Sequence, residues 1–100
     1  MAKIQLRITP SFANLLGNND YDWFIVEKEI DNHATLGSLL KELSNGHPGF
    51  ARILFEPKTG KLNQEIMITL NDRLLQGADA MEVIPKDGDI VIVTPAYEGG

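Results

Sequence analysis

The C-terminal residues of the sequence have the types that could take part in covalent chemistry. The sequence ends Thr94-Pro95-Ala96-Tyr97-Glu98-Gly99-Gly100. Glycine has no Cβ, so a narrow channel in a partner protein can accept Gly99 and Gly100 where bulkier residues would clash. We expect the α-carboxylate of Gly100 to be the reacting group, with no side chain obstructing access to it.

Other residues with reactive or metal-binding side chains do not form a convincing site in the sequence. The absence of cysteine excludes disulfides, a thiolate zinc site and a cysteine nucleophile. His33 and His47 have no carboxylate or cysteine ligands near them, so we interpret them as solvated loop histidines rather than metal ligands. Asn71 and Asp72 read as a tight turn. We therefore expect no metal, no cofactor bound by the chain itself, and a carrier or co-substrate rather than a self-contained enzyme.

The composition indicates one small acidic globular domain. The 100 residues are 43% hydrophobic and carry a net charge of -5. The nine Lys and Arg residues are scattered, whereas nucleic-acid binding needs clustered basic side chains. The apolar runs are far too short to span a bilayer, and we expect no signal peptide. The expectation is a cytoplasmic protein without nucleic-acid or membrane partners.

The body that must hold this tail is predicted to consist of short strands and one main helix. Residues 35–45 form the clearest helix, because Thr35 can cap its start while Gly46 and Pro48 follow its end. Its apolar stripe consists of Leu36, Leu39, Leu40 and Leu43. Strands are predicted at residues 4–8, 23–30, 65–70, 74–75 and 90–94. We interpret residues 11–17 as one helical turn or an irregular loop, and residues 77–81 as a loop.

The second predicted strand has two apolar faces. We expect Phe24 and Val26 to face the core, because the opposite parity would bury Glu27 and Glu29. Trp23 and Ile25 would then lie on the other face of the sheet. They mark either a partner surface or a patch that a loop covers, and the pattern favours neither.

The last predicted strand should be central. Residues 90–94 are almost continuously apolar, which is typical of a strand buried on both faces or nearly so. Pro95 should end the strand, so that residues 95–100 leave the sheet. The first two strands are close enough for a hairpin, and the first and last could be parallel neighbours. This order indicates an α+β fold, and the β-grasp is one of several such folds that it fits.

Residues 85–100 resemble the ubiquitin-like sulfur carriers. The shared pattern is a turn of Lys86-Asp87-Gly88-Asp89, an apolar strand, a proline and a terminal Gly-Gly. His47-Pro48 and Leu70-Asn71-Asp72-Arg73 are similar to further positions of that family. The family includes the small subunit of molybdopterin synthase, the thiamine-pathway carrier, and carriers of cysteine synthesis and tRNA thiolation. The resemblance implies a β-grasp domain over residues 1–94, with a mixed sheet of about five strands, and a flexible tail over residues 95–100.

The resemblance also implies a chemistry and a set of partners. A ubiquitin-activating-type enzyme would use ATP to adenylate the Gly100 carboxylate, and a sulfur donor would convert it to a thiocarboxylate. A large synthase subunit or another acceptor enzyme would then take the sulfur, as in molybdopterin synthase. The residues expected to contact these partners are Pro95, Ala96, Tyr97, Glu98, Trp23 and Ile25.

This sequence departs from molybdopterin-synthase small subunits just before the glycines. Those subunits commonly have two prolines and a small residue there, whereas this chain has Ala96 in place of the second proline and then Tyr97-Glu98. A charged residue in this segment implies a different or altered partner channel. We expect Tyr97 and Glu98 to decide which partner accepts the tail.

Two alternatives to a sulfur carrier remain open. The chain could be a ubiquitin-like modifier that is conjugated to lysines through Gly100. It could also be a non-catalytic β-grasp binding module with an inert tail, whose function lies at Trp23, Ile25 and the surface around them.

Overall fold

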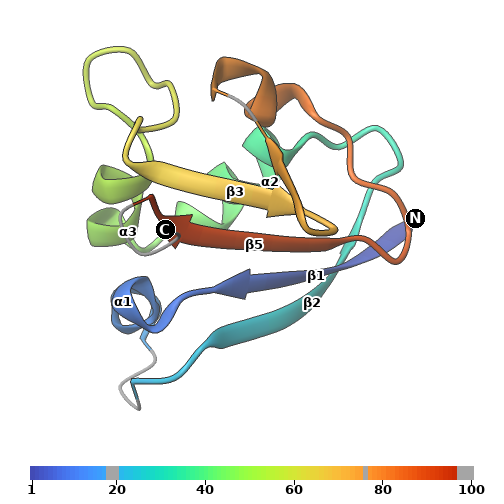
Figure 1. Ribbon diagram of the computed structural model, residues 1–100, viewed down its shortest axis with the longest axis horizontal. Helices are drawn as coiled ribbons and strands as arrows, with labels where there is room; N and C mark the ends of the chain where they lie inside the picture. The colour runs from blue at the N-terminus through green and yellow to red at the C-terminus, as the bar shows by residue number, and fades with distance from the viewer. Residues whose placement is uncertain (18–20, 76, 97–100) are drawn as a thin grey trace.

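The computed structural model describes residues 1–17, 21–75 and 77–96. Five strands form one mixed sheet in the order β2-β1-β5-β3-β4 (Figure 1). These are β1 (Ala2–Ile8), β2 (Phe24–Ile30), β3 (Ile66–Leu70), β4 (Arg73–Leu75) and β5 (Ile90–Pro95). Strands β1 and β5 are parallel, and the other neighbouring pairs are antiparallel. The predicted parallel central pair and the short edge strand are confirmed.

The core lies between one face of the sheet and the helices. Alternate residues of each long strand face it, and its largest fully buried side chains include Ile4, Leu6, Ile8, Ile68, Val91 and Val93. Strand β2 has the predicted parity, because Phe24 and Val26 pack against the core while Glu27 and Glu29 are exposed. Placing the carboxylates in water avoids the free-energy penalty of burying unpaired charge.

The main predicted helix is α2 (Leu36–Ser44), and its ends follow the expected capping chemistry. The Ser38 N–H donates to Thr35 Oγ1 at 3.1 Å, and the Thr35 N–H donates to Ser38 Oγ at 3.2 Å. This reciprocal capping box satisfies two backbone donors that would otherwise lack partners. Past the other end, Gly46 has a φ of +83°, a conformation that glycine adopts without steric penalty.

Besides α2, the described residues contain two further α-helices. The predicted single turn at residues 11–17 consists of α1 (Pro10–Ala13) and the 3-10 helix η1 (Asn14–Leu16). The helical alternative for this stretch is therefore confirmed. A second helix, α3 (Pro48–Leu54), was not predicted. Pro48 was interpreted only as a stop signal for α2, but it also begins α3, where its missing N–H has no intrahelical partner to lose.

The expected hairpin of the first two strands is confirmed, because β1 and β2 pair antiparallel and α1 and η1 lie in their connection. Two other details of the sequence interpretation are wrong. Residues 77–81 belong to the 3-10 helix η2 (Gly77–Glu82), which lies beside the start of α2, where the Leu36 N–H donates to Val83 O at 2.8 Å. Strand β5 is not buried on both faces, because Ile90, Ile92 and Thr94 are only half-buried.

The helices lie on one side of the sheet, which explains the alternating burial of β5. In Figure 1, α2 and α3 lie behind the sheet, and its other face is turned toward the viewer. That uncovered side is the open face. None of the helices in the described ranges is long and apolar enough to cross a membrane.

Candidate functional site

Strand β5 carries the chain to its C-terminal end and is held on both sides. Its hydrogen bonds alternate between its two neighbours. The Asn71 N–H donates to Ile90 O at 2.9 Å and the Ala96 N–H donates to Glu65 O at 2.7 Å, both on the β3 side. On the β1 side, the Thr9 N–H donates to Val93 O at 3.2 Å. This two-sided pairing fixes the position and direction of the strand up to Ala96.

Pro95 lies inside the strand, contrary to the expectation that the chain leaves the sheet at this residue. It pairs with Ile66 and is less than 2% exposed. Successive residues of β5 direct their backbone groups alternately to β3 and to β1. At Pro95, the nitrogen that lacks a hydrogen faces the β1 side, where β1 has already ended at Ile8. The sheet therefore loses no hydrogen bond to the proline. Pro95 belongs to the core, and Ala96 is the first exposed residue after it.

The remaining predicted tail residues lie outside the described residues. These are Tyr97, Glu98, Gly99 and Gly100. Their expected roles stay predictions, and the geometry of the candidate site rests on the sheet that precedes them.

The turn before β5 is tied to the first strand. The Lys3 N–H donates to Asp87 Oδ1, and the Gly88 N–H donates to Lys3 O, each at 2.8 Å. Gly88 has a φ of +89°, which a residue with a Cβ rarely adopts. The Lys-Asp-Gly-Asp pattern thus has a structural explanation, since it anchors the start of β5 to the start of β1.

The same turn is also tied to the β3–β4 hairpin. Asn71 Nδ2 donates to Asp89 Oδ1, and the Ile90 N–H donates to Asn71 Oδ1, each at 2.8 Å. Asp89 also accepts from the Lys86 N–H at 2.7 Å through its other carboxylate oxygen. The prediction of a turn at Asn71 and Asp72 is confirmed, because both have positive φ values.

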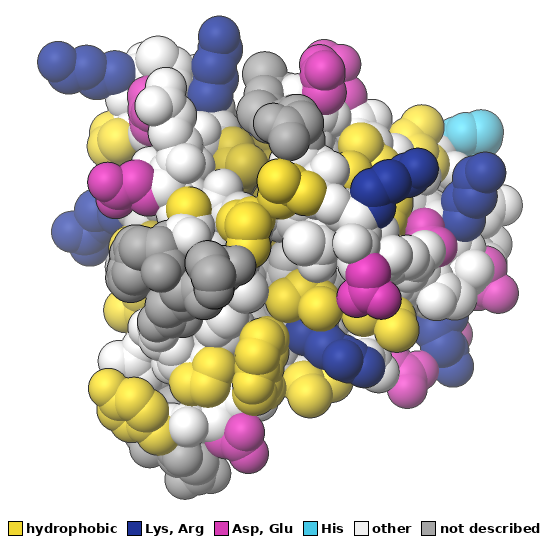
Figure 2. Space-filling model, in the orientation of Figure 1, with side chains coloured by type: hydrophobic (Ala, Val, Ile, Leu, Met, Phe, Trp, Pro, Cys, Tyr) yellow, Lys and Arg dark blue, Asp and Glu magenta, His cyan; other side chains and the backbone are white. Residues whose placement is uncertain are grey.

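The open face carries an apolar surface that includes two predicted partner-binding residues. Trp23 is 40% exposed and Ile25 is 55% exposed. The described residues leave both side chains exposed, as expected of the partner-surface alternative. Figure 2 shows hydrophobic side chains gathered over the strands on this face, with charged side chains among and around them.

The register places further residues beside Ile25. One row of paired residues crosses the whole sheet, in the order Ile25, Arg7, Ile92, Thr69 and Leu74. Leu74 is 47% exposed. The sequence interpretation did not assign Ile92 and Leu74 to a partner surface. The sequence could have identified Ile92, because neighbouring residues of a strand point to opposite faces of the sheet, and Ile92 lies between the buried Val91 and Val93.

Lys3 and Arg7, two basic residues of the open face, have polar partners on the same face. Lys3 Nζ lies 3.8 Å from Glu27 in an exposed ion pair. Arg7 Nε donates to Gln5 Oε1 on the same strand, and Arg7 pairs with Ile25 on one side and with Ile92 on the other. The face combines exposed apolar area with a fixed cation, an arrangement suited to binding another protein.

Two hydroxyls at the end of the central strands have no hydrogen-bond partner in the described part of the chain. These are the buried Oγ1 atoms of Thr9 and Thr94. Thr9 follows β1 and Thr94 precedes Pro95, so both lie where the chain approaches its C-terminal end. The two histidines lie apart at opposite ends of α2, and the described residues contain no group of three potential metal ligands.

Comparison with known proteins places this arrangement in a family. The sequence model of the ThiS family matches residues 23–100. The small archaeal modifier protein 3 of Haloferax volcanii is 29% identical over 98 residues, which cover 98% of this chain and 99% of that protein. The sulfur carrier protein CysO of Mycobacterium tuberculosis is 31% identical over 67 residues, covering 66% of this chain and 72% of that protein.

A solved structure agrees with the architecture. The crystal structure of the small archaeal modifier protein SAMP1 of Haloferax volcanii superposes with a TM-score of 0.74 at 21% identity. The match covers 99% of this chain and all of that chain. The fold is therefore the ubiquitin-like β-grasp, which confirms the predicted fold class.

Proposed function

Since this chain belongs to the ThiS family of ubiquitin-like sulfur carriers and modifiers, we propose that it carries sulfur as a thiocarboxylate on Gly100. The proposal rests on the position of β5, which directly precedes the C-terminal residues. The strand is paired on both sides, Pro95 is buried, and Ala96 is exposed directly after it. The four residues that follow can reach at most about 14 Å, which suits insertion into the site of a docked enzyme.

The proposed reaction has two steps. The Gly100 carboxylate attacks the α-phosphorus of ATP in the activating enzyme, forming an acyl-adenylate and releasing pyrophosphate. Hydrosulfide from the sulfur donor then attacks the acyl carbon, AMP leaves, and a thiocarboxylate remains. Adenylation is needed because a carboxylate oxygen is a poor leaving group. The chain supplies the acyl group, and the partner supplies the nucleotide site.

The open face supports a docking role in this reaction. Trp23 and Ile25 are exposed, and Ile92 and Leu74 lie in the same surface. We propose that this surface binds the adenylating enzyme and then the acceptor, in the manner of a large synthase subunit. Exposed apolar area of this kind is typical of interaction sites. Tyr97 and Glu98 would select the channel that receives the tail, and so the pathway that receives the sulfur.

Intact-mass measurement tests the carrier proposal. The full chain is incubated with ATP, the adenylating enzyme and sulfide, and its mass should rise by about 16 Da as one oxygen is replaced by sulfur. A chain lacking Gly100 is the control, and it should keep its fold but show no such rise. An unchanged mass in the presence of an enzyme that does adenylate the chain would overturn the proposal.

Conjugation through Gly100 is a second candidate function. It is favoured by the similarity to small archaeal modifier protein 3, which extends over 98% of this chain. A lysine amine would then attack the acyl carbon of the same acyl-adenylate, AMP would leave with loss of a proton from the amine, and an isopeptide bond would remain. Covalent adducts in a cell extract that disappear when Gly99 and Gly100 are deleted would support it. Adducts that persist after the deletion would exclude it.

A further inference from the structure

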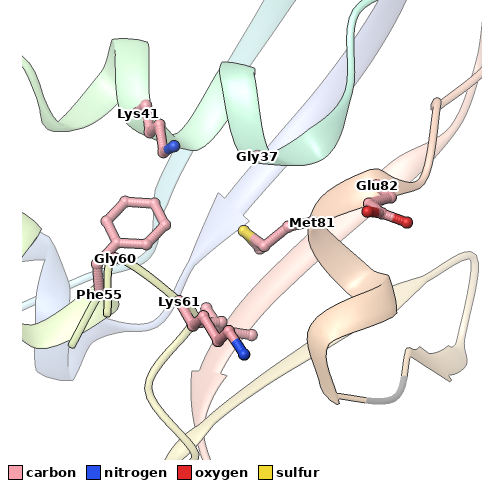
Figure 3. A pocket seen from close by; sticks show the side chains of 8 residues that line it. Gly37, Lys41, Phe55, Gly60, Lys61, Met81 and Glu82 are labelled. Carbon is pink, nitrogen blue, oxygen red and sulfur yellow. The ribbon is translucent and has the colours of Figure 1, made fainter. Parts of the chain in front are cut away.

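The helical side of the sheet carries a groove that is separate from the open face. A hollow of about 220 Å³ lies between α2, the loop over residues 55–62 and η2. Its apolar walls are Phe55, Leu62 and Met81, all half-buried (Figure 3). The hollow lies on the covered side of the sheet, so a molecule bound here would leave the open face free.

The walls of this hollow are held by the backbone. Phe55 and Leu62 pair as an isolated bridge, and the Glu56 N–H donates to Lys61 O at 2.8 Å. On the opposite wall, α2 and η2 approach so closely that a Cβ on Gly37 would lie 2.9 Å from Met81 O. The hollow is therefore a defined feature of the fold, with fixed loop and helix walls.

The groove is framed by lysines. Figure 3 shows Lys41, from α2, on one side of Phe55 and Lys61, from the loop, on the other. Neither ammonium group has an ion-pair partner in the described part of the chain. Glu82 is the acidic side chain at this hollow. Around the groove, the basic side chains of Lys41, Arg52 and Lys61 outnumber the acidic ones of Glu56 and Glu82, although the whole chain carries a charge of -5.

A second hollow extends the groove past Phe55. It has a volume of about 310 Å³, shares Lys41, Phe55 and Gly60 with the first, and adds Arg52 and Glu56. Pockets that enclose a drug-sized molecule have volumes of about 300–1,000 Å³. The first hollow lies below that range and suits one side chain, while the continuous groove suits an extended segment that passes over it.

We propose that this groove binds an acidic peptide segment of a partner protein. One large apolar side chain of the segment fills the hollow between Phe55 and Met81, and flanking carboxylates pair with Lys41 and Lys61. Such a segment complements both the apolar walls and the excess of positive charge. The proposal goes beyond sulfur transfer and does not depend on it. It gives the chain a second contact surface that can be occupied while the open face and the C-terminal residues engage an enzyme.

Titration of the full-length chain with a short peptide, followed by amide NMR shifts, tests this inference. The probe is acetyl-Glu-Asp-Leu-Asp-Glu-amide. One comparison peptide has alanine in place of leucine, and another has lysine in place of every acidic residue. The probe should shift the amides of Gly37, Lys41, Lys61 and Met81 and leave those of Arg7 and Ile92 unchanged. Both comparison peptides should bind at least about fivefold more weakly.

Charge reversal provides the matched variants. Lys41→Glu and Lys61→Glu should each weaken probe binding about fivefold, and the double variant more than about tenfold, because like charges then face the peptide. Lys86→Glu makes the same charge change in the turn before β5 and should alter binding less than about twofold. Equal weakening by Lys86→Glu would overturn the proposal. So would shifts on the open face or equal binding of the lysine peptide.

Discussion

Asn71 and Asp89 join the β3–β4 hairpin to the turn that begins β5, with Asn71 Nδ2 donating to Asp89 Oδ1 at 2.8 Å. Asn71 also accepts from the Ile90 N–H through Oδ1, so one amide side chain spans two segments nearly twenty residues apart. This contact fixes the start of the strand that carries the chain to Gly100. It connects the β3–β4 turn to the start of β5.

Removal of the Asn71 side chain should destabilise the fold. Asn71→Ala loses both hydrogen bonds and places alanine at a φ of +50°, so the free energy of unfolding should fall by about 2–3 kcal/mol. Urea unfolding measures the change. Asn32→Ala, which replaces an exposed asparagine, is the control and should change stability by less than about 0.5 kcal/mol. Equal effects of the two substitutions would show that the Asn71 contacts contribute nothing.

Two glycines in helices should respond oppositely to alanine. Gly37→Ala places a Cβ 2.9 Å from Met81 O, which is backbone, so α2 and η2 must move apart. We expect a loss of about 1–3 kcal/mol, larger than the gain in helix propensity. Gly49→Ala places a Cβ at an ordinary 3.4 Å from Leu15 Cδ2 and should be neutral or stabilising. Thermal unfolding of both variants checks the pair, and a stabilised Gly37→Ala would refute the close-approach explanation.

Replacing Thr94 with valine should stabilise the protein. Thr94 Oγ1 is buried without a hydrogen-bond partner among the described residues, and valine keeps the shape without that polar atom. The free energy of unfolding should rise by about 0.5–2 kcal/mol. Urea unfolding would detect this, with Thr59→Val as a control, since the hydroxyl of Thr59 accepts from the Lys61 N–H at 3.2 Å. A drop in stability for Thr94→Val would mean that its hydroxyl is satisfied in solution.

The open face can be tested apart from the fold. Ile25→Glu should lower kcat/KM for adenylation of the chain by about tenfold or more, because it places an unpaired charge in the proposed contact surface. Ile84→Glu is the matched control, since Ile84 is 46% exposed, similar to Ile25, but lies in the loop after η2. Pyrophosphate release measures the rate. Equal losses for both variants would argue against a specific role for the open face.

The sequence interpretation succeeded where a local pattern has a single physical outcome. Thr35 before a leucine stripe and Gly46 after it defined α2, since capping and helical periodicity act within a few residues. The charges of Glu27 and Glu29 predicted which face of β2 packs against the core, because burying these carboxylates would be unfavourable. It failed at α3, where Pro48 fits both the end of one helix and the start of the next.

The amino-acid sequence by itself determined that the last two residues are glycines, that no cysteine chemistry is available and that the body is α+β. These properties follow from residue types and short-range spacing. Only the tertiary structure decided that Pro95 is a buried strand residue, that Ile92 and Leu74 share a surface with Ile25, and that Lys41 and Lys61 frame one groove. Each of these depends on which distant segments pair or pack together, and strand register and helix placement are set by the whole core rather than by any local stretch.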